Sequence, residues 1–97
     1  MAIYTTLDRE TITGLSTAKG FTAAKLTKNV VYALVDVVDG PVRVCKQGTT
    51  PVANTTGIRF TKDSTFEVWS HKDLINFLAI DDGGTAKLEV EYVGTAD

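Results

Sequence analysis

The nine residues from Val30 to Val38 are the longest nearly apolar stretch of the chain, and only Asp36 interrupts it. Nine residues cannot cross a bilayer as a helix, which takes about 20, but β-branched side chains favour a strand because they pack well on a pleated surface. Both faces of that strand would be apolar, with Val31, Ala33, Val35 and Val37 on one side and Val30, Tyr32, Leu34 and Val38 on the other. We therefore expect a central strand, covered by a second sheet or by a neighbouring subunit.

Short apolar segments alternate with turn residues along the whole chain, about every 8–12 residues. This spacing predicts an all-β fold, an antiparallel β-sandwich or small barrel of about seven or eight short strands with at most one helical turn. Besides residues 30–38, strands are expected at residues 42–46, 57–60, 65–69, 75–80 and 86–93, with Ile58 and Phe60 facing inward. A helical turn at residues 70–74 would start at Ser70 as its N-cap, and residues 81–84 predict a hairpin.

The N-terminal third leaves alternatives open. Residues 3–7 are either a first strand, with residues 10–13 pairing to it, or part of an extended arm over residues 1–8 that reaches a neighbour. Residues 21–26 are either a short strand or give way to a helical turn within residues 16–24. The sequence predicts neither alternative over the other.

Size and charge narrow the function classes. The 97 residues suffice for one domain, residues 1–97, because two could not each bury a core. The net charge of −2 argues against nucleic acid as the main partner, since phosphate binding usually requires a clustered basic patch. The sequence has one cysteine, which excludes an internal disulfide. It also has one histidine, and a single cysteine and a single histidine are too few for most zinc sites. The N-terminus has neither the basic nor the apolar segment of a targeting signal, so we expect no membrane segment. The sequence also has no glycine-rich phosphate-binding motif, so we expect no cofactor.

Three features hold candidate chemistry, and each favours a structural interpretation. Ser70-His71-Lys72-Asp73 contains the residue types of a catalytic triad, but triad residues converge from separate elements, so we expect His71 in a surface turn. Cys45 lies mid-strand near cationic residues, and we expect a half-buried structural thiol. Asp81 and Asp82 precede two glycines without the alternating ligands of a calcium loop, so they predict a turn. We therefore expect a protein that is not an enzyme.

Aromatic and apolar side chains supply the candidate interface residues. Trp69 would share its strand face with polar residues, and an exposed indole marks a protein interface or a sugar platform. The alternative for Trp69 is packing against the following turn at residues 74–75. Ile3, Tyr4 and Leu7 form a terminal apolar segment that either adds a strand to its own sheet or contacts a neighbour. We predict an interface built from Ile3, Tyr4, Leu7 and Trp69.

Several segments follow one another in a characteristic order: Gly20-Phe21-Thr22-Ala23-Ala24, the apolar strand, Val42-Arg43-Val44, Gly48-Thr49-Thr50-Pro51, Thr56-Gly57-Ile58, Phe66-Glu67-Val68, and residues 75–80 and 84–92. In order and spacing, over about three quarters of the chain, they resemble a group of small tailed-bacteriophage proteins encoded among virion structural genes. Each segment alone is mostly turn and strand pattern, and the order is the more specific feature.

The resemblance implies a virion accessory protein with a β-sandwich fold. The first expectation is a capsid decoration (cement) protein that binds the major capsid protein and stabilises the head lattice. The alternatives are a neck or tail accessory protein, or a carbohydrate-binding module on the virion surface. The resemblance further implies other virion proteins as partners, a homo-oligomer, and assembly into the virion in the host cytoplasm. It brings no catalytic residues.

Overall fold

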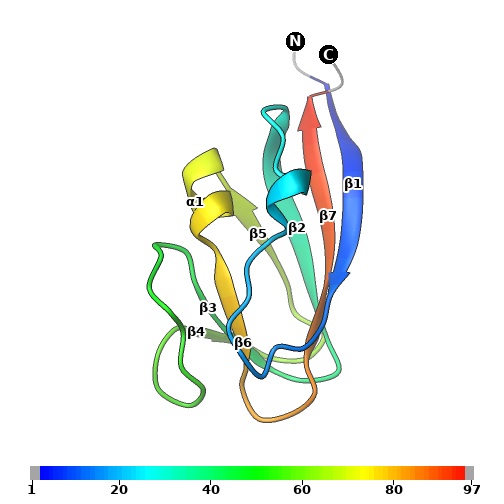
Figure 1. Ribbon diagram of the computed structural model, residues 1–97. Helices are drawn as coiled ribbons and strands as arrows, with labels where there is room; N and C mark the ends of the chain where they lie inside the picture. The colour runs from blue at the N-terminus through cyan, green and yellow to red at the C-terminus, as the bar shows by residue number, and fades with distance from the viewer. Residues whose placement is uncertain (1–2, 96–97) are drawn as a thin grey trace.

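The structure is a computed structural model that describes residues 3–95. Within these residues, seven strands form two antiparallel sheets, so the predicted sandwich-like all-β fold is confirmed and no closed barrel forms (Figure 1). In chain order the elements are β1 (Tyr4–Ile12), the 3-10 turn η1 (Ala23–Lys25), β2 (Val30–Val38), β3 (Val42–Cys45), β4 (Ile58–Phe60), β5 (Thr65–Trp69), α1 (His71–Asn76), β6 (Leu78–Asp81) and β7 (Lys87–Thr95).

The larger sheet has the strand order β1-β7-β2-β5, and the smaller sheet has the order β4-β3-β6. β2 is the predicted apolar strand, and it lies between β7 and β5. Its inward residues Ala33, Val35 and Val37 are fully buried. The prediction of a central strand beneath a second sheet is therefore confirmed for this side of β2.

One hydrophobic core fills the space between the two sheets. The smaller sheet contributes Val42, Val44 and Ala79, and the larger one contributes Val68, Leu88 and Val90 among others. Phe77, between α1 and β6, stacks on Phe21 with the ring centroids 4.2 Å apart. Each fully buried aliphatic side chain stabilises the fold by roughly 1.5–3 kcal/mol, so the inward faces of the sheets hold most of the stability.

β1 is one continuous strand, so the alternative in which residues 10–13 pair with a first strand at residues 3–7 is wrong. It pairs antiparallel with β7, from Tyr4 opposite Thr95 to Ile12 opposite Leu88. Residues 4–8 therefore pair within their own chain and do not extend as an arm; the first two residues of that predicted arm lie outside the described residues. The register shifts at Leu7, which is the extra residue of a β-bulge. The bulge interrupts the alternation of side chains along β1, and for this reason the sequence pattern divides the strand into two.

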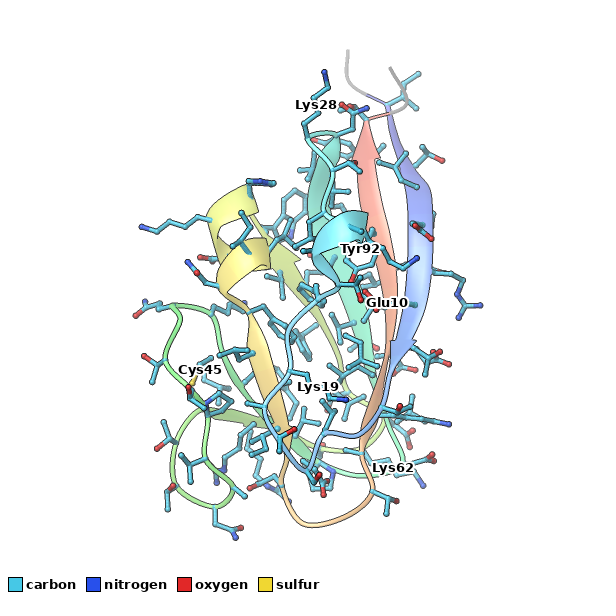
Figure 2. The ribbon with its side chains drawn as sticks, viewed as in Figure 1. Glu10, Lys19, Lys28, Cys45, Lys62 and Tyr92 are labelled. Carbon is cyan, nitrogen blue, oxygen red and sulfur yellow. The ribbon has the colours of Figure 1, made fainter. Side chains whose placement is uncertain are left out.

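The connection from β1 to β2 contains the turn η1, so the alternative of a strand at residues 21–26 is wrong. Glu10 explains the turn: its carboxylate accepts hydrogen bonds from the Thr22 N–H at 3.1 Å and from the Thr22 hydroxyl at 2.6 Å. The hydroxyl of Tyr92 donates to the same carboxylate (Figure 2). These contacts fix the segment before β2 against β1 and β7. Its backbone pairs with no strand there and forms the local turn η1 instead.

The segment after β5 differs from the prediction in its length. Ser70 is the N-cap as predicted, since its hydroxyl accepts a hydrogen bond from the Asp73 N–H at 3.3 Å. The helix, however, continues to Asn76, and the strand expected at residues 75–80 begins only at Leu78. Leu74 on α1 is fully buried, and its packing explains why the helix outlasts a single turn.

The turn predicted at residues 81–84 forms, but it does not make a hairpin. The Gly84 N–H donates to the Asp81 carboxylate at 3.1 Å, and Gly83 has a φ of 119°. β6 belongs to the smaller sheet and β7 to the larger one, so the turn crosses between the sheets. Local residues specify a turn, whereas packing decides which strands pair.

Ile58 is not buried as predicted: it shares the side of β4 that carries Phe60, but 67% of its surface is exposed. It lies on β4, the edge strand of the smaller sheet. On this strand Phe60 reaches the larger sheet, where its ring stacks on Phe66 with the centroids 4.3 Å apart. The inward side of β4 is thus covered only at Phe60.

Candidate docking face

The side of the larger sheet that faces away from the core presents three rows of residues, each crossing all four strands. The strand registers align Thr6, Val93, Tyr32 and Trp69 in the first row, Arg9, Glu91, Leu34 and Glu67 in the second, and Thr11, Glu89, Asp36 and Thr65 in the third. We call these residues, together with Tyr4, the outer face.

Three aromatic rings gather at one end of the outer face. Tyr32 stacks on the Trp69 indole with the ring centroids 4.2 Å apart, and Tyr4 meets Tyr32 edge-on at 6.4 Å. Tyr4 stands on β1 and Tyr32 on β2, so their rings reach across β7 and cover Val93, which is buried. Tyr4 and Trp69 nevertheless remain 50% and 45% exposed. Exposed tyrosine and tryptophan side chains are typical of protein interfaces.

Carboxylates dominate the other two rows, which hold Asp36, Glu67, Glu89 and Glu91. Glu67 accepts a hydrogen bond from the Trp69 indole N–H at 2.9 Å. Glu89 lies 4.0 Å from the Arg9 guanidinium, the cation of these two rows. The acidic rows therefore carry a net negative charge next to the aromatic cluster.

A shallow hollow of about 330 Å³ lies among these rows, and Leu34 is its apolar lining residue. Its polar lining consists of Arg9, Asp36, Thr65, Glu89 and Glu91. The side-chain carboxylates of Asp36 and Glu91 make neither a hydrogen bond nor an ion pair with any residue that the structure describes. The hollow thus combines an apolar surface with two carboxylates that only solvent satisfies.

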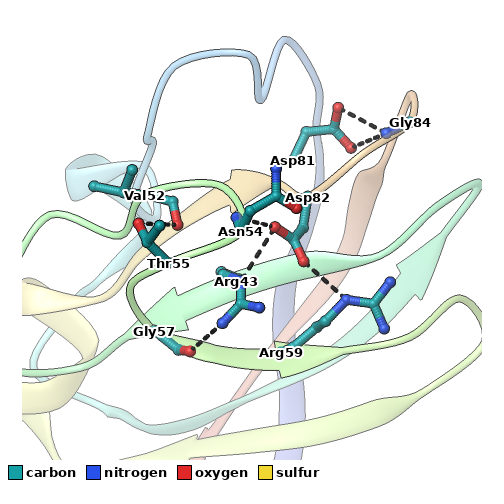
Figure 3. A network of polar contacts seen from close by, with 9 residues as sticks. All are labelled: Arg43, Val52, Asn54, Thr55, Gly57, Arg59, Asp81, Asp82 and Gly84. Atoms are coloured by element: carbon teal, nitrogen blue, oxygen red, sulfur yellow. Dashed lines mark hydrogen bonds and ion pairs between the residues drawn. The ribbon is translucent and has the colours of Figure 1, made fainter.

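The buried carboxylate of Asp82, directly after β6, has the opposite surroundings (Figure 3). Arg43 and Arg59 donate to it at 3.1 and 2.8 Å, and the Asn54 N–H donates at 2.6 Å. The Asn54 N–H, together with the two guanidinium groups, holds the pKa of Asp82 below its ordinary value against the opposing effect of burial. This network ties the loop of residues 46–57 to the sheet and is structural.

The structure places the predicted interface residues on two sides of the larger sheet. Tyr4 and Trp69 lie on the outer face, with Tyr32 between them. Leu7 packs over Gly94, whose Cα–Cβ direction points to the other side of β7. Ile3 precedes β1 and is 66% exposed. The structure therefore brings only Tyr4 and Trp69 onto one surface.

The sequence does not predict that Tyr32, Leu34 and Asp36 lie on the surface. The apolar character of both sides of Val30–Val38 predicts a strand covered on both sides, whereas Tyr32 and Leu34 are only half-buried. The sequence does contain one indication: Asp36 alternates with Tyr32 and Leu34 along the strand and therefore lies on the same side of it. A charged residue in that position indicates the side that faces solvent or a partner.

The other candidates keep the structural roles that the sequence predicts. His71 is exposed at the start of α1, and Cys45 is half-buried on β3. Asp81 accepts the turn hydrogen bond from Gly84. Among residues 3–95, no group of three or more His, Cys, Asp or Glu residues could hold a metal ion. In the same part of the chain, no helix is long and apolar enough to cross a membrane.

No protein-family model, no curated protein and no solved structure matches this chain. Its function is therefore inferred from the outer face and from the order of the sequence features.

Proposed function

We propose that this protein is a non-enzymatic virion structural protein, a capsid decoration protein that docks on the head lattice of a tailed bacteriophage through its outer face. The observation that carries the proposal is the exposed aromatic cluster of Tyr4, Tyr32 and Trp69 beside unpartnered carboxylates. The order of sequence features, which resembles small phage virion proteins, supports it. The proposed partner is the major capsid protein or another virion protein.

The aromatic cluster suits docking for an energetic reason. Tryptophan and tyrosine at the centre of an interface commonly contribute about 2 kcal/mol or more each. Tyr32 and Trp69 are already stacked in the free protein, so little side-chain entropy remains to be lost when a partner covers them. A rigid strand surface therefore retains most of the contact energy as affinity.

β1 supplies the contact for the homo-oligomer that we propose. It is the edge strand of the larger sheet and pairs with β7 on one side, with no described strand on the other. Such an edge can pair with a strand of a second copy, and an oligomer that engages several lattice sites gains by avidity. Sedimentation velocity should show an oligomer at micromolar concentration; a monomer over the whole range would contradict it.

A carbohydrate-binding module on the virion surface is the second candidate. Trp69 lies on the edge strand β5 with part of its indole exposed and Glu67 beside it, and sugars stack on such rings. Tyr32 is less suited, because Trp69 stacks on it and Tyr4 meets it edge-on. Trp69 is the chain's one tryptophan, so unchanged emission across a broad glycan panel would remove this candidate.

Cosedimentation with phage heads that lack the protein tests the decoration role. The wild-type protein should bind saturably, at a fixed and high ratio of copies to capsid subunits. Trp69→Ala should weaken binding by roughly tenfold or more, which corresponds to about 1.4 kcal/mol or more. Ile75→Ala is the matched control, because Ile75 is 60% exposed but lies on α1, off the outer face; it should bind like the wild type.

Other outcomes would overturn the proposal. Binding of only a few copies per particle would assign the protein to the neck or tail instead of the head lattice. Absence of binding to heads would reject the decoration role. Equal losses for Trp69→Ala and Ile75→Ala would reject the outer face as the docking surface.

A further inference from the structure

We propose that the partner surface presents an arginine side chain next to an apolar one, with the arginine lying in the hollow over Leu34 and its guanidinium between Asp36 and Glu91. The inference rests on the proposed function in that it specifies the partner chemistry of the same outer face. The occupant is thus a protein surface with a local positive charge, and the apolar side chain beside the arginine packs on Tyr32 and Trp69.

The shape and lining of the hollow fit an arginine side chain. The hollow holds about 330 Å³, with Leu34 as apolar lining and carboxylates around it. Arginine has an apolar stem and a charged end, and it buries the stem along apolar surface while the guanidinium stays at the polar rim. Leu34 would contact the stem, and Asp36 and Glu91 would accept hydrogen bonds from the charged end.

Charge complementarity points the same way. The three rows hold Asp36, Glu67, Glu89 and Glu91 against one cation, Arg9. The adjoining cation on the same side of β7, Lys87, lies 3.5 Å from the Asp39 carboxylate. Arg9 lies 4.0 Å from Glu89, and its side chain is 66% exposed, so one guanidinium is already accommodated at this rim. Asp36 and Glu91 have no partner among the described residues and remain available for a second guanidinium.

The free protein places two like charges opposite each other, and such a partner would offset their repulsion. Asp36 stands directly opposite Glu89 across β2 and β7. Like charges in directly opposite positions of two strands destabilise a sheet. A guanidinium placed beside Asp36 converts this repulsion into attraction, so docking gains both the new contacts and the lost repulsion.

Arginine is favoured over lysine by the two unpartnered carboxylates of the hollow. Its planar guanidinium donates in a fork that matches carboxylates, whereas the lysine ammonium is a strongly hydrated point charge. Tyr32 and Leu34 are two residues apart on β2, and two residues of a strand span about 7 Å. An arginine and its neighbouring apolar residue can therefore reach the hollow and the rings together.

Two capped dipeptides test the inference without phage heads. Acetyl-Leu-Arg-amide and its neutral counterpart acetyl-Leu-citrulline-amide are titrated into the full-length protein, and amide chemical shifts are followed by NMR. The arginine peptide should bind in the millimolar range and shift the amides of Leu34, Asp36 and Glu91. The citrulline peptide should bind roughly fivefold more weakly, since two exposed ion pairs contribute modestly.

The variant Asp36→Asn/Glu91→Gln should reduce arginine-peptide binding to the level of the citrulline peptide. Asp63→Asn is the matched control, because Asp63 is exposed in the turn before β5 and has a φ of 70°, which asparagine tolerates. It should bind the arginine peptide like the wild type. Equal binding of both peptides, or equal effects of the two variants, would overturn the inference.

The same double variant separates this inference from the proposed function in the head cosedimentation. Heads that bind the wild type and the double variant equally well would overturn the arginine site while leaving the decoration role intact. Heads that bind neither protein, together with an arginine-specific shift in the NMR titration, would reject the decoration role and retain the arginine site.

Discussion

Glu10 and Asp36 stand on opposite sides of the same four-stranded sheet, in opposite surroundings. Glu10, on the covered side, accepts hydrogen bonds from the Tyr92 hydroxyl and from the N–H and hydroxyl of Thr22. Asp36, on the outer face, has no partner among the described residues and lies opposite Glu89. The covered side thus pairs its carboxylate within the chain, whereas the outer face leaves one to solvent.

This difference assigns different roles to the two sides of the sheet: the covered side stabilises the fold, and the outer face is available to a partner. Glu10 is half-buried, and a polar group that is withdrawn from water costs free energy unless it is paired, so its hydrogen bonds within the chain stabilise the covered side. An exposed carboxylate is solvated by water, and leaving it unpaired costs little. The outer face can therefore hold exposed rings and free carboxylates that serve a partner, while the inward residues hold the fold.

Replacing two leucines of the larger sheet, one on each side, should give the largest difference in the free energy of unfolding. Leu88→Ala should lower the free energy of unfolding by about 3 kcal/mol, because Leu88 is fully buried on the inward side. Leu34→Ala should cost about 1 kcal/mol or less, because Leu34 is only half-buried on the outer face. Urea denaturation of both variants measures the difference. Equal losses would mean that the outer face is packed as tightly as the core.

Two tyrosines should give the next largest contrast. Tyr92→Phe removes the hydroxyl that donates to Glu10 and should cost about 1–2 kcal/mol. Tyr32→Phe removes a hydroxyl on the exposed side of the sheet and should cost less than about 0.5 kcal/mol. Thermal or urea denaturation tests the pair. A larger loss for Tyr32→Phe would contradict the assignment of stability to the covered side.

Tyr92 should also make stability depend on alkaline pH. Burial first, and then the Glu10 carboxylate, raise the pKa of Tyr92 well above its ordinary value. An unfolded chain releases this proton near pH 10 while the folded chain keeps it, so the contribution is complete below about pH 10 and falls as the pH rises further. The loss is at most about 1.4 kcal/mol per pH unit, and Tyr92→Phe should lack it. Parallel profiles of the two proteins between pH 9 and about 11 would refute this.

Asp36→Asn should produce the smallest effect, with the opposite sign. Removing the charge opposite Glu89 relieves repulsion between β2 and β7, so the free protein should gain about 0.5 kcal/mol. The exposed control Asp63→Asn should change stability by less than that. Urea midpoints in low salt measure both, since added salt screens the repulsion. A loss of stability in Asp36→Asn would show that Asp36 supports the fold.

The strands and turns follow from the sequence to a large extent, and the exceptions have particular causes. β2 and β5 lie where alternation and branched residues predict them, because these signals are local. The bulge at Leu7, the carboxylate of Glu10 that bends residues 21–26, and the helix held by buried Leu74 depend on contacts with distant segments. The crossing between sheets after Asp81 likewise depends on packing, not on the turn itself.

The outer face follows from the sequence only in part. Tyr4 and Trp69 can be recognised as exposed aromatic residues. Their common neighbour Tyr32 is harder to recognise, because both sides of its strand are apolar and only Asp36 marks the uncovered side. The acidic rows combine residues from β2, β5 and β7, and only the strand order brings those together. Leu7 shows the converse: it is an apolar residue close to Tyr4 in the chain, yet it lies on the other side of the sheet.

An electron cryomicroscopy reconstruction of heads decorated with the wild-type protein tests the central claim most directly. The account predicts density for the protein at every equivalent lattice position, with Tyr32 and Trp69 covered by the capsid protein and an arginine of that protein over Leu34. Bound copies whose outer face points to solvent would contradict it, as would heads that carry no density for the protein at all.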